Sequence, residues 1–64
     1  DLKGREIVEV NRLMRSRGFE LTDESLGSDG DSLEWWYNRR TRQCYMLGYG
    51  GTYLRQITNV EKCD

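Results

Sequence analysis

Hydrophobic residues near the start of the chain recur at the spacing of a helix. Ile7, Val10 and Met14 are separated by three and four positions, and most charged residues of this segment fall elsewhere on a helical projection. Gly18 stands where the end of a helix often needs a residue with a positive φ angle. The pattern therefore predicts an amphipathic helix over residues 3–17.

The hydrophobic pattern changes from helical spacing to alternation after this glycine. Residues 19–22 alternate between apolar and polar and predict a short strand or an extended arm, whereas residues 27–32 have the composition of a loop. Three longer runs, rich in aromatic and β-branched residues, predict strands at 33–38, 43–49 and 52–58. Together these elements predict an α+β fold, with one N-terminal helix packed on a three- to four-stranded antiparallel meander sheet.

Two turn signals separate the last three predicted strands. Asn38 begins a polar turn, in which its side chain can bond to its own backbone two residues on. Gly50 and Gly51 fit a two-residue hairpin turn that requires positive φ angles. Turns as short as these predict that consecutive strands pair with each other.

Both faces of the predicted sheet carry large apolar side chains. Leu33, Trp35 and Tyr37 point to one face of the first long strand, and the residues between them, Trp36 included, point to the other. One helix covers one face, so the other needs cover from residues 19–26, from a second copy of the chain or from a partner. The sequence leaves open which face the helix covers.

The length of 64 residues indicates a single domain, residues 1–64. The core of so small a domain gives only marginal stability unless a covalent cross-link adds to it. Cys44 and Cys63 are its two cysteines, and a disulfide between them would contribute about 3 kcal/mol by closing a loop. The alternative is a pair of free cysteines in a cytosolic protein. Because the chain has no histidine and no CxxC motif, we expect no zinc site.

A disulfide implies an oxidising compartment, so the sequence favours a periplasmic or secreted location. The chain begins at Asp1 and has no apolar segment that resembles a signal peptide or is long enough to cross a membrane. We therefore expect a mature piece of an exported protein, without a membrane span.

The residue types argue against catalysis and against a bound cofactor. No histidine is present to act as acid and base at neutral pH, and no nucleophile, base and oxyanion donor can be assembled. Glu34, beside the tryptophans, is a carboxyl whose pKa would rise if it were buried, but an exposed strand position is its more ordinary role. The Asp- and Gly-rich loop lacks the ligand spacing of an EF-hand, so we expect no metal ion there.

Charge is unevenly distributed, although the net charge is only −1. Residues 20–34 contain six acidic residues and no basic one, whereas the four charged residues between 35 and 60 are all arginines. Aromatic side chains flanked by arginines can stack on unpaired bases and bind phosphates. The alternative is that the aromatics form the core and the arginines a solvated turn, and the near-neutral charge argues against nucleic acid. The candidate binding residues are Trp35, Trp36, Tyr37, Arg39, Arg40, Arg42, Tyr45, Tyr53 and Arg55.

Two resemblances to known families add to this interpretation. The chain contains Trp36-Tyr37-Asn38-Arg39-x-Thr41-Arg42-Gln43-Cys44 and, further on, Ile57-x-x-Val60-x-x-Cys63. This run resembles the W-[WY]-N-x-x-T-[RK]-x-C core of small exported bacterial proteins of uncharacterised function, which often have a second cysteine near the end. The order of a helix, a glycine and aromatic residue, and then strands is similar to PepSY-like periplasmic modules, which are thought to bind or restrain peptidases and envelope proteins but usually lack paired cysteines. The resemblances imply an exported α+β module without known chemistry.

We therefore expect a non-catalytic exported interaction module that binds a protein or peptide through the aromatic sheet face or an exposed strand edge. A second copy of the chain is a compatible partner. Single-stranded nucleic-acid binding by the arginine–aromatic surface is the alternative hypothesis. The first hypothesis loses its support if Trp35, Trp36 and Tyr37 are all fully buried.

Overall fold

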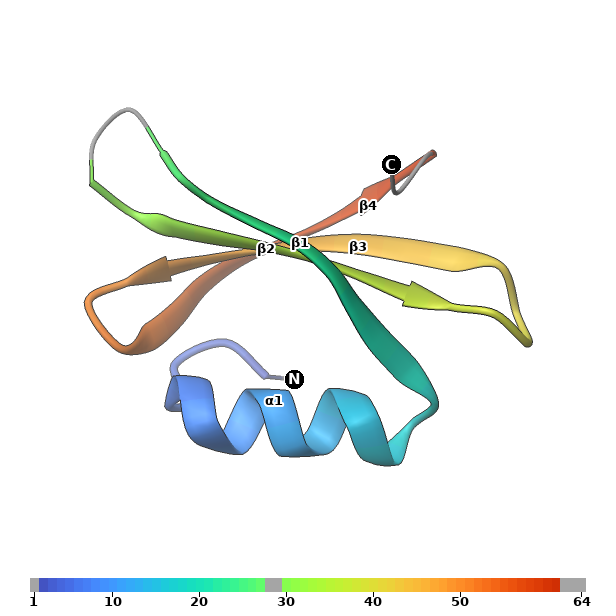
Figure 1. The fold of residues 1–64 in the computed structure, drawn as a ribbon. Helices are drawn as coiled ribbons and strands as arrows, with labels where there is room; N and C mark the ends of the chain where they lie inside the picture. The colour runs from blue at the N-terminus through green and yellow to red at the C-terminus, as the bar shows by residue number, and fades with distance from the viewer. Residues whose placement is uncertain (1, 28–29, 62–64) are drawn as a thin grey trace.

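The computed structural model describes residues 2–27 and 30–61 of the chain. Within these residues the elements follow in the order α1 (Ile7–Ser16), β1 (Phe19–Leu26), β2 (Ser32–Asn38), β3 (Gln43–Gly50) and β4 (Tyr53–Val60). Figure 1 shows α1 lying across one face of a twisted sheet. The predicted α+β fold with an N-terminal helix is confirmed.

The four strands form one antiparallel sheet in the order β1-β2-β3-β4. Each strand pairs with the next one along the chain, so that Trp36 lies opposite Tyr45 and Leu47 lies opposite Ile57. Short connections favour such pairing of sequential strands. The sheet is the predicted meander in its four-stranded form.

β1 is longer than the strand or arm predicted at residues 19–22. Its pairing with β2 passes an irregularity between Leu21 and Asp23 and then continues until Leu26 lies opposite Ser32. Acidic residues have low strand propensity, so the alternation of the sequence alone did not predict this extension. As an edge strand, β1 does not fold over the sheet, so residues 19–26, one of the three possible covers, do not cover the second face.

The turn between β3 and β4 lies one residue later than predicted. Gly50 pairs with Tyr53 at the end of the ladder, so Gly51 and Thr52 form the two-residue turn. Gly51 has a positive φ of 63°, whereas Gly50 does not have a positive φ. Glycine at the first central position is the pattern of a type II′ hairpin turn, which requires one positive φ angle instead of two.

α1 begins later than predicted and ends at Ser16, one residue before the predicted end. It starts at Ile7 because residues 4–6 run beside β4, where the Gly4 amide donates a 2.8 Å hydrogen bond to the carbonyl of Leu54. At the other end, Gly18 has a φ of 91°, which a residue with a side chain rarely adopts. Glycine therefore terminates the helix as its position in the sequence indicated.

The hydrophobic core lies between α1 and the sheet. Val10 and Met14, from the predicted helical stripe, are buried there against Trp36, whose exposed fraction is 0%. The buried members of the core are Leu2, Val10, Met14, Trp36, Leu47, Tyr49 and Leu54. The helix thus covers the face that contains Trp36, and Trp35 and Tyr37 point to the opposite face.

Candidate functional site

The sheet face opposite α1 is built from alternate residues of β2, β3 and β4. Residues directly opposite each other in an antiparallel ladder project from the same face. The register therefore makes three rows across this face: Tyr37–Cys44–Val60, Trp35–Met46–Thr58 and Leu33–Gly48–Gln56. We call the apolar side chains of these rows the open face; they are Leu33, Trp35, Tyr37, Cys44, Met46 and Val60.

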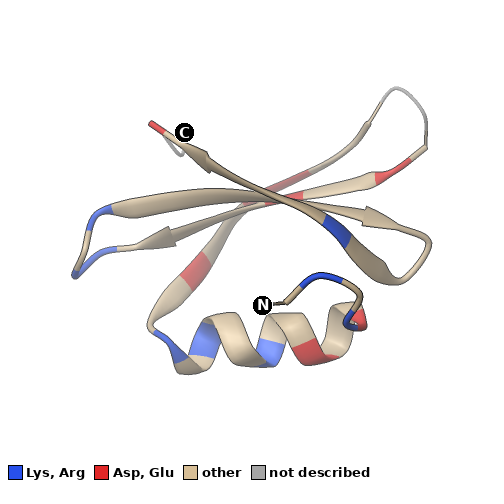
Figure 2. Cartoon of the chain, turned by 180° about the vertical axis from the view of Figure 1, so that it is seen from behind, with Lys and Arg blue, Asp and Glu red and all other residues tan. Residues whose placement is uncertain are grey.

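Trp35 and Tyr37 of the open face remain partly exposed, in contrast to the fully buried Trp36. Figures 1 and 2, which view the molecule from opposite sides, both show α1 on one side of the sheet, and no described helix or strand lies over the open face. The other apolar side chains of the open face are half-buried as well, apart from Cys44, which is buried. Because Trp35 and Tyr37 are not fully buried, the interaction hypothesis stays a prediction.

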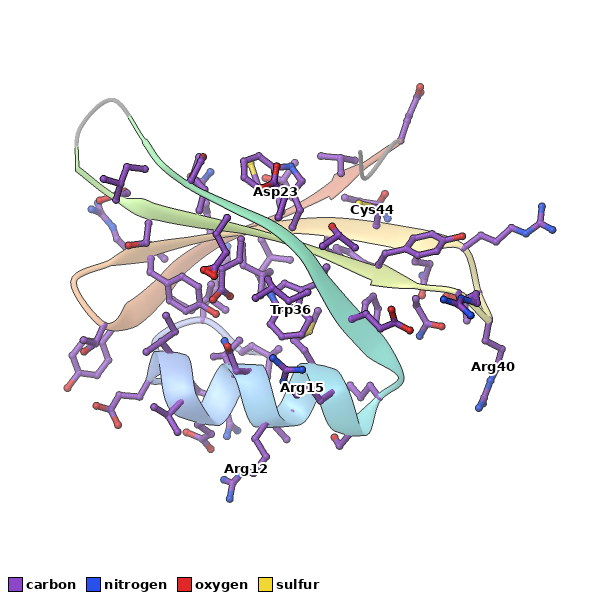
Figure 3. The ribbon with its side chains drawn as sticks, in the orientation of Figure 1. Arg12, Arg15, Asp23, Trp36, Arg40 and Cys44 are labelled. Atoms are coloured by element: carbon purple, nitrogen blue, oxygen red, sulfur yellow. The ribbon has the colours of Figure 1, made fainter. Side chains whose placement is uncertain are left out.

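Carboxylates of β1 border the open face. Glu20 lies opposite Tyr37, and Asp23 lies opposite Trp35. Between them, the Thr22 hydroxyl donates a 3.2 Å hydrogen bond to the backbone carbonyl of Trp35. Figure 3 shows Asp23 on the side of the sheet away from Trp36. The aromatic pair is therefore flanked by negative charge along one strand.

The arginine-bearing turn between β2 and β3 is held at one end of the sheet by Asn38. Its amide nitrogen donates to the carbonyl of Arg17 at 3.1 Å, and its amide oxygen accepts from the backbone N–H groups of Arg40 and Thr41 at 3.0 and 3.3 Å. The predicted bond from Asn38 to the backbone two residues on is thereby confirmed. Figure 2 shows that basic residues of the turn and of the end of α1 gather at the same end of the molecule.

The structure divides the nine candidate binding residues among several places. Trp35 and Tyr37 come together on the open face, while the predicted turn residues Arg39, Arg40 and Arg42 are exposed at the end of the sheet. The Arg39 guanidinium is 3.9 Å from the carboxylate of Glu20. The turn thus presents positive charge beside the open face instead of within it.

Trp36 and Tyr45 face the helix instead of the solvent side of the sheet. The guanidinium of Arg15 lies 5.3 Å from the ring centroid of Trp36. Both side chains are labelled in Figure 3, on the helix side of the sheet. Tyr45 is partly buried, and its ring is 5.7 Å from that of Phe19 at an angle of 57°. These two aromatic residues therefore serve the core and its margin.

Tyr53 and Arg55 lie toward the hairpin end of β4. Tyr53 is exposed and forms an isolated bridge with Glu6, and the Arg55 guanidinium is 3.7 Å from the carboxylate of Asp31. Distance along the strands separates both residues from the β2–β3 turn. The arginines and aromatics thus do not form one continuous surface among the described residues.

Glu34 is buried, so the expectation of an ordinary exposed position for it was wrong. Its exposed fraction is 6%, and its carboxylate accepts hydrogen bonds from the indole of Trp36 at 3.0 Å and from the amide of Asn11 at 3.3 Å. The Asn11 amide also lies 3.4 Å from the hydroxyl of Tyr49. Every buried side-chain polar atom among the described residues has a partner. The cluster therefore satisfies its own hydrogen bonds under the helix.

The buried cluster changes the pKa of Tyr49. Burial raises the pKa of the Tyr49 hydroxyl well above its ordinary value, and the hydrogen bond and negative charge of Glu34 raise it further. The hydrogen bond from Asn11 acts in the opposite direction. The phenol is thus held in its neutral form, which suits a structural donor and not a base at neutral pH.

A groove of about 360 Å³ opens on the helix side of the sheet, between the end of α1 and the β3–β4 hairpin. It is lined by Leu2, Met14, Arg17, Phe19, Gln43, Tyr45, Leu47 and Ile57. Most of these side chains belong to the core or its margin. The groove is therefore a gap at the margin of the hydrophobic core, beside the C-terminal end of α1.

The structure describes one of the two cysteines of the predicted disulfide. Cys44 lies on the open face with an exposed fraction of 2%, whereas Cys63 lies outside the described residues. The Cys44–Cys63 disulfide therefore stays a prediction.

In the described part of the chain, no group of three or more acidic, cysteine or histidine side chains is placed to hold a metal ion. No helix formed by these residues could span a membrane.

Comparisons with protein-family models, with curated proteins and with solved structures found no match to this chain. Function is therefore inferred from the residues and their arrangement.

Sequence reasoning did not single out Asp23, Asn11 or Tyr49. The position of Asp23 beside Trp35 depends on the irregular register of β1, and the partners of Glu34 come from a helix and a strand distant in sequence. The alternation of apolar and polar residues predicts neither the position of Asp23 nor the partners of Glu34. An acidic residue at a strand position facing apolar neighbours, as at Glu34, is the one sign that a buried polar cluster was present.

Proposed function

We propose that this domain is a non-catalytic interaction module that binds a protein or peptide through the open face. The observation that supports it is the pair Trp35 and Tyr37, adjacent on a sheet face that no described element covers. Both side chains keep part of their apolar surface in water, and removing such surface from water contributes roughly 25 cal/mol per Å², so covering this pair favours association. Tyrosine and tryptophan are also the residues that most often dominate binding energy at interfaces.

The face is a better binding surface than either edge of the sheet. Residues 4–7 already bond to the start of β4 at Leu54 and to the preceding turn at Thr52. The edge of β1 is interrupted by its irregular register and bears several charged side chains, two features that protect edge strands against the addition of another strand. Recognition by side-chain contact on the open face is therefore favoured over recognition by strand addition.

A binding role fits the chemistry of the buried polar groups. The carboxylate of Glu34 is occupied by donors from Trp36 and Asn11, and the Tyr49 phenol is held neutral. Groups engaged in this way stabilise a core and are poorly placed to exchange protons with a substrate. We accordingly propose binding without catalysis.

Export to the periplasm or beyond the cell is the second part of the proposal. It is supported by the predicted Cys44–Cys63 disulfide and by the resemblance of residues 36–44 to small exported bacterial proteins. Fractionation of cells that express the full-length natural protein tests it. We expect the protein outside the cytoplasm, and recovery in the cytoplasm alone would contradict export.

Nucleic-acid binding is the alternative, favoured by the exposed arginines of the β2–β3 turn near the end of α1. Titration with fluorescein-labelled oligothymidine at low and high salt tests it. Binding that weakens steeply with salt and is lost when Arg39, Arg40 and Arg42 are replaced by glutamine would support this alternative. No binding at low salt would eliminate it.

Selection of peptides from a random displayed library on the immobilised domain tests the main proposal. Selected peptides are expected to lose binding when Trp35→Ala or Tyr37→Ala is introduced. Val8→Ser is the matched control, because Val8 is a large apolar residue that is 75% exposed on the helix. Peptides that bind the Trp35→Ala and Tyr37→Ala variants as well as the wild type would contradict the open face as the site, as would a selection that yields no binder.

A further inference from the structure

We propose that the open face recognises a lysine or arginine side chain carried on an apolar segment of the partner, with Asp23 receiving the positive charge beside Trp35 and Tyr37. This inference rests on the proposed function and names the chemistry of its partner.

The register of β1 turns Asp23 toward the open face. Leu21 lies opposite Trp36 on the helix side, and in a regular strand the residue two positions on would point to the same side. Instead, two steps along β1 correspond to one step along β2, so Asp23 lies opposite Trp35. The extra residue, Thr22, donates its hydroxyl to the Trp35 carbonyl at 3.2 Å. Bulges of this kind often redirect a side chain at a functional site.

Asp23 is exposed, and among the described residues no cation lies within ion-pair distance of its carboxylate. Its recorded hydrogen bond is with the backbone N–H of Glu24, at 2.8 Å. Two other carboxylates near the ends of the sheet do have arginine neighbours, Glu20 with Arg39 and Asp31 with Arg55. Asp23 is therefore a carboxylate on the open-face side of β1 whose charge a cationic group of a partner can neutralise.

Aromatic rings next to a carboxylate favour a ligand that is both apolar and cationic. Lysine and arginine have apolar stems that pack on rings, and their charged ends are attracted to the ring face. The same chain makes this contact on its other face, where the Arg15 guanidinium lies 5.3 Å from the centroid of Trp36. A neutral apolar side chain would satisfy the rings of the open face but leave Asp23 without a counter-charge, and an acidic one would be repelled.

The test uses peptides of one frame, acetyl-Gly-Leu-X-Leu-Gly-amide, in which X is lysine, arginine, norleucine or glutamate. Binding is followed by the indole N–H signals of ¹⁵N-labelled protein, because Trp36 is buried and Trp35 is not. We expect the lysine and arginine peptides to shift Trp35 and to bind about tenfold more tightly than the norleucine peptide at low salt. The glutamate peptide is expected to bind most weakly.

Two variants on adjacent residues of β1 separate recognition from general effects of charge. Asp23→Asn keeps the acceptor for the Glu24 amide and removes the charge, and it is expected to abolish the preference for lysine over norleucine. Glu24→Gln removes the same charge from the next residue, which lies opposite Glu34 and not on the open face. It is expected to keep the preference. Thermal unfolding of both variants verifies that they remain folded.

The outcomes distinguish this inference from the function on which it rests. Equal binding of lysine and norleucine peptides at Trp35 would overturn the preference for a cation and leave the interaction module standing. No shift of Trp35 with any peptide of this series, together with a failed library selection, would overturn both. Sedimentation showing a dimer that buries Trp35 without peptide would overturn the inference in favour of a second copy of the chain.

Discussion

The indole nitrogen of Trp36 donates a 3.0 Å hydrogen bond to the carboxylate of Glu34. Glu34 lies two residues earlier on the same strand, and its side chain is almost fully buried. Residues at this spacing point to the same face of a strand, so both side chains lie under α1. Burial of a carboxylate is costly unless its oxygens are hydrogen-bonded, and Asn11 of the helix and the Tyr49 hydroxyl supply further hydrogen bonds. The pair therefore lies on the face that α1 covers, and Asn11 links it to the helix.

Replacement of Glu34 by alanine is expected to destabilise the domain by about 1–3 kcal/mol, because the Trp36 indole and the Asn11 amide would be left without their buried acceptor. Urea unfolding followed by tryptophan fluorescence measures the change. Glu20→Ala is the control, since Glu20 is an exposed carboxylate and surface substitutions usually cost less than about 0.5 kcal/mol. Equal stability of the Glu34→Ala variant and the wild type would show that the buried network contributes nothing.

Stability is expected to fall at alkaline pH because of Tyr49. Its pKa is raised in the folded state by burial first and by Glu34 next, so the folded chain keeps this proton at a pH where the unfolded chain has lost it. The contribution is fully present below about pH 10, the ordinary tyrosine pKa, and is lost as the pH rises above that value. Urea unfolding between pH 8 and 11 is the measurement.

The Tyr49→Phe variant isolates this effect, because it cannot ionise at that position while all other titrating groups remain. The difference in free energy of unfolding between the wild type and Tyr49→Phe should be constant below about pH 10. Above that pH, the wild type should lose stability relative to Tyr49→Phe. Parallel curves over the whole range would mean that the Tyr49 pKa is the same in both states.

Asn38→Ala is expected to lower stability by about 1–2 kcal/mol, because one side chain connects the end of α1 with the β2–β3 turn through Arg17, Arg40 and Thr41. Amide hydrogen exchange should accelerate at Arg40 and Thr41. Thr41→Ala serves as the control, since it removes an exposed hydroxyl bonded to Gln43 and leaves the Asn38 bonds in place. If both variants exchange and unfold alike, Asn38 does not join these elements.

Local patterns were enough to predict the elements of this fold. The helical stripe of Val10 and Met14 and the alternation around Trp36 both reflect one buried face, and each can be recognised within a few neighbouring residues. The stop at Gly18 is equally local, because it depends on the backbone angle of a single residue. These features therefore agreed between sequence and structure.

The differences come from pairing between distant segments. The helix starts late because residues 4–6 bond to β4, and β1 is extended because β2 holds it in register up to Leu26. The open face could be foreseen as a surplus of aromatic residues. The carboxylate at its border could not be predicted, because the orientation of Asp23 depends on an irregularity in the pairing of β1 with β2. The alternation of apolar and polar residues does not reveal that irregularity.

The last prediction concerns the two cysteines. Cys44 is 2% exposed on the open face, and the predicted bond to Cys63 would stabilise the folded domain by about 3 kcal/mol through loop closure. Protein prepared under oxidising conditions is expected to contain no thiol that reacts under denaturing conditions, and reduction should lower the urea midpoint. The Cys44→Ala/Cys63→Ala variant should unfold at one midpoint whether or not reductant is present. Two reactive thiols in the oxidised preparation would remove the disulfide and, with it, the chemical argument for an oxidising compartment.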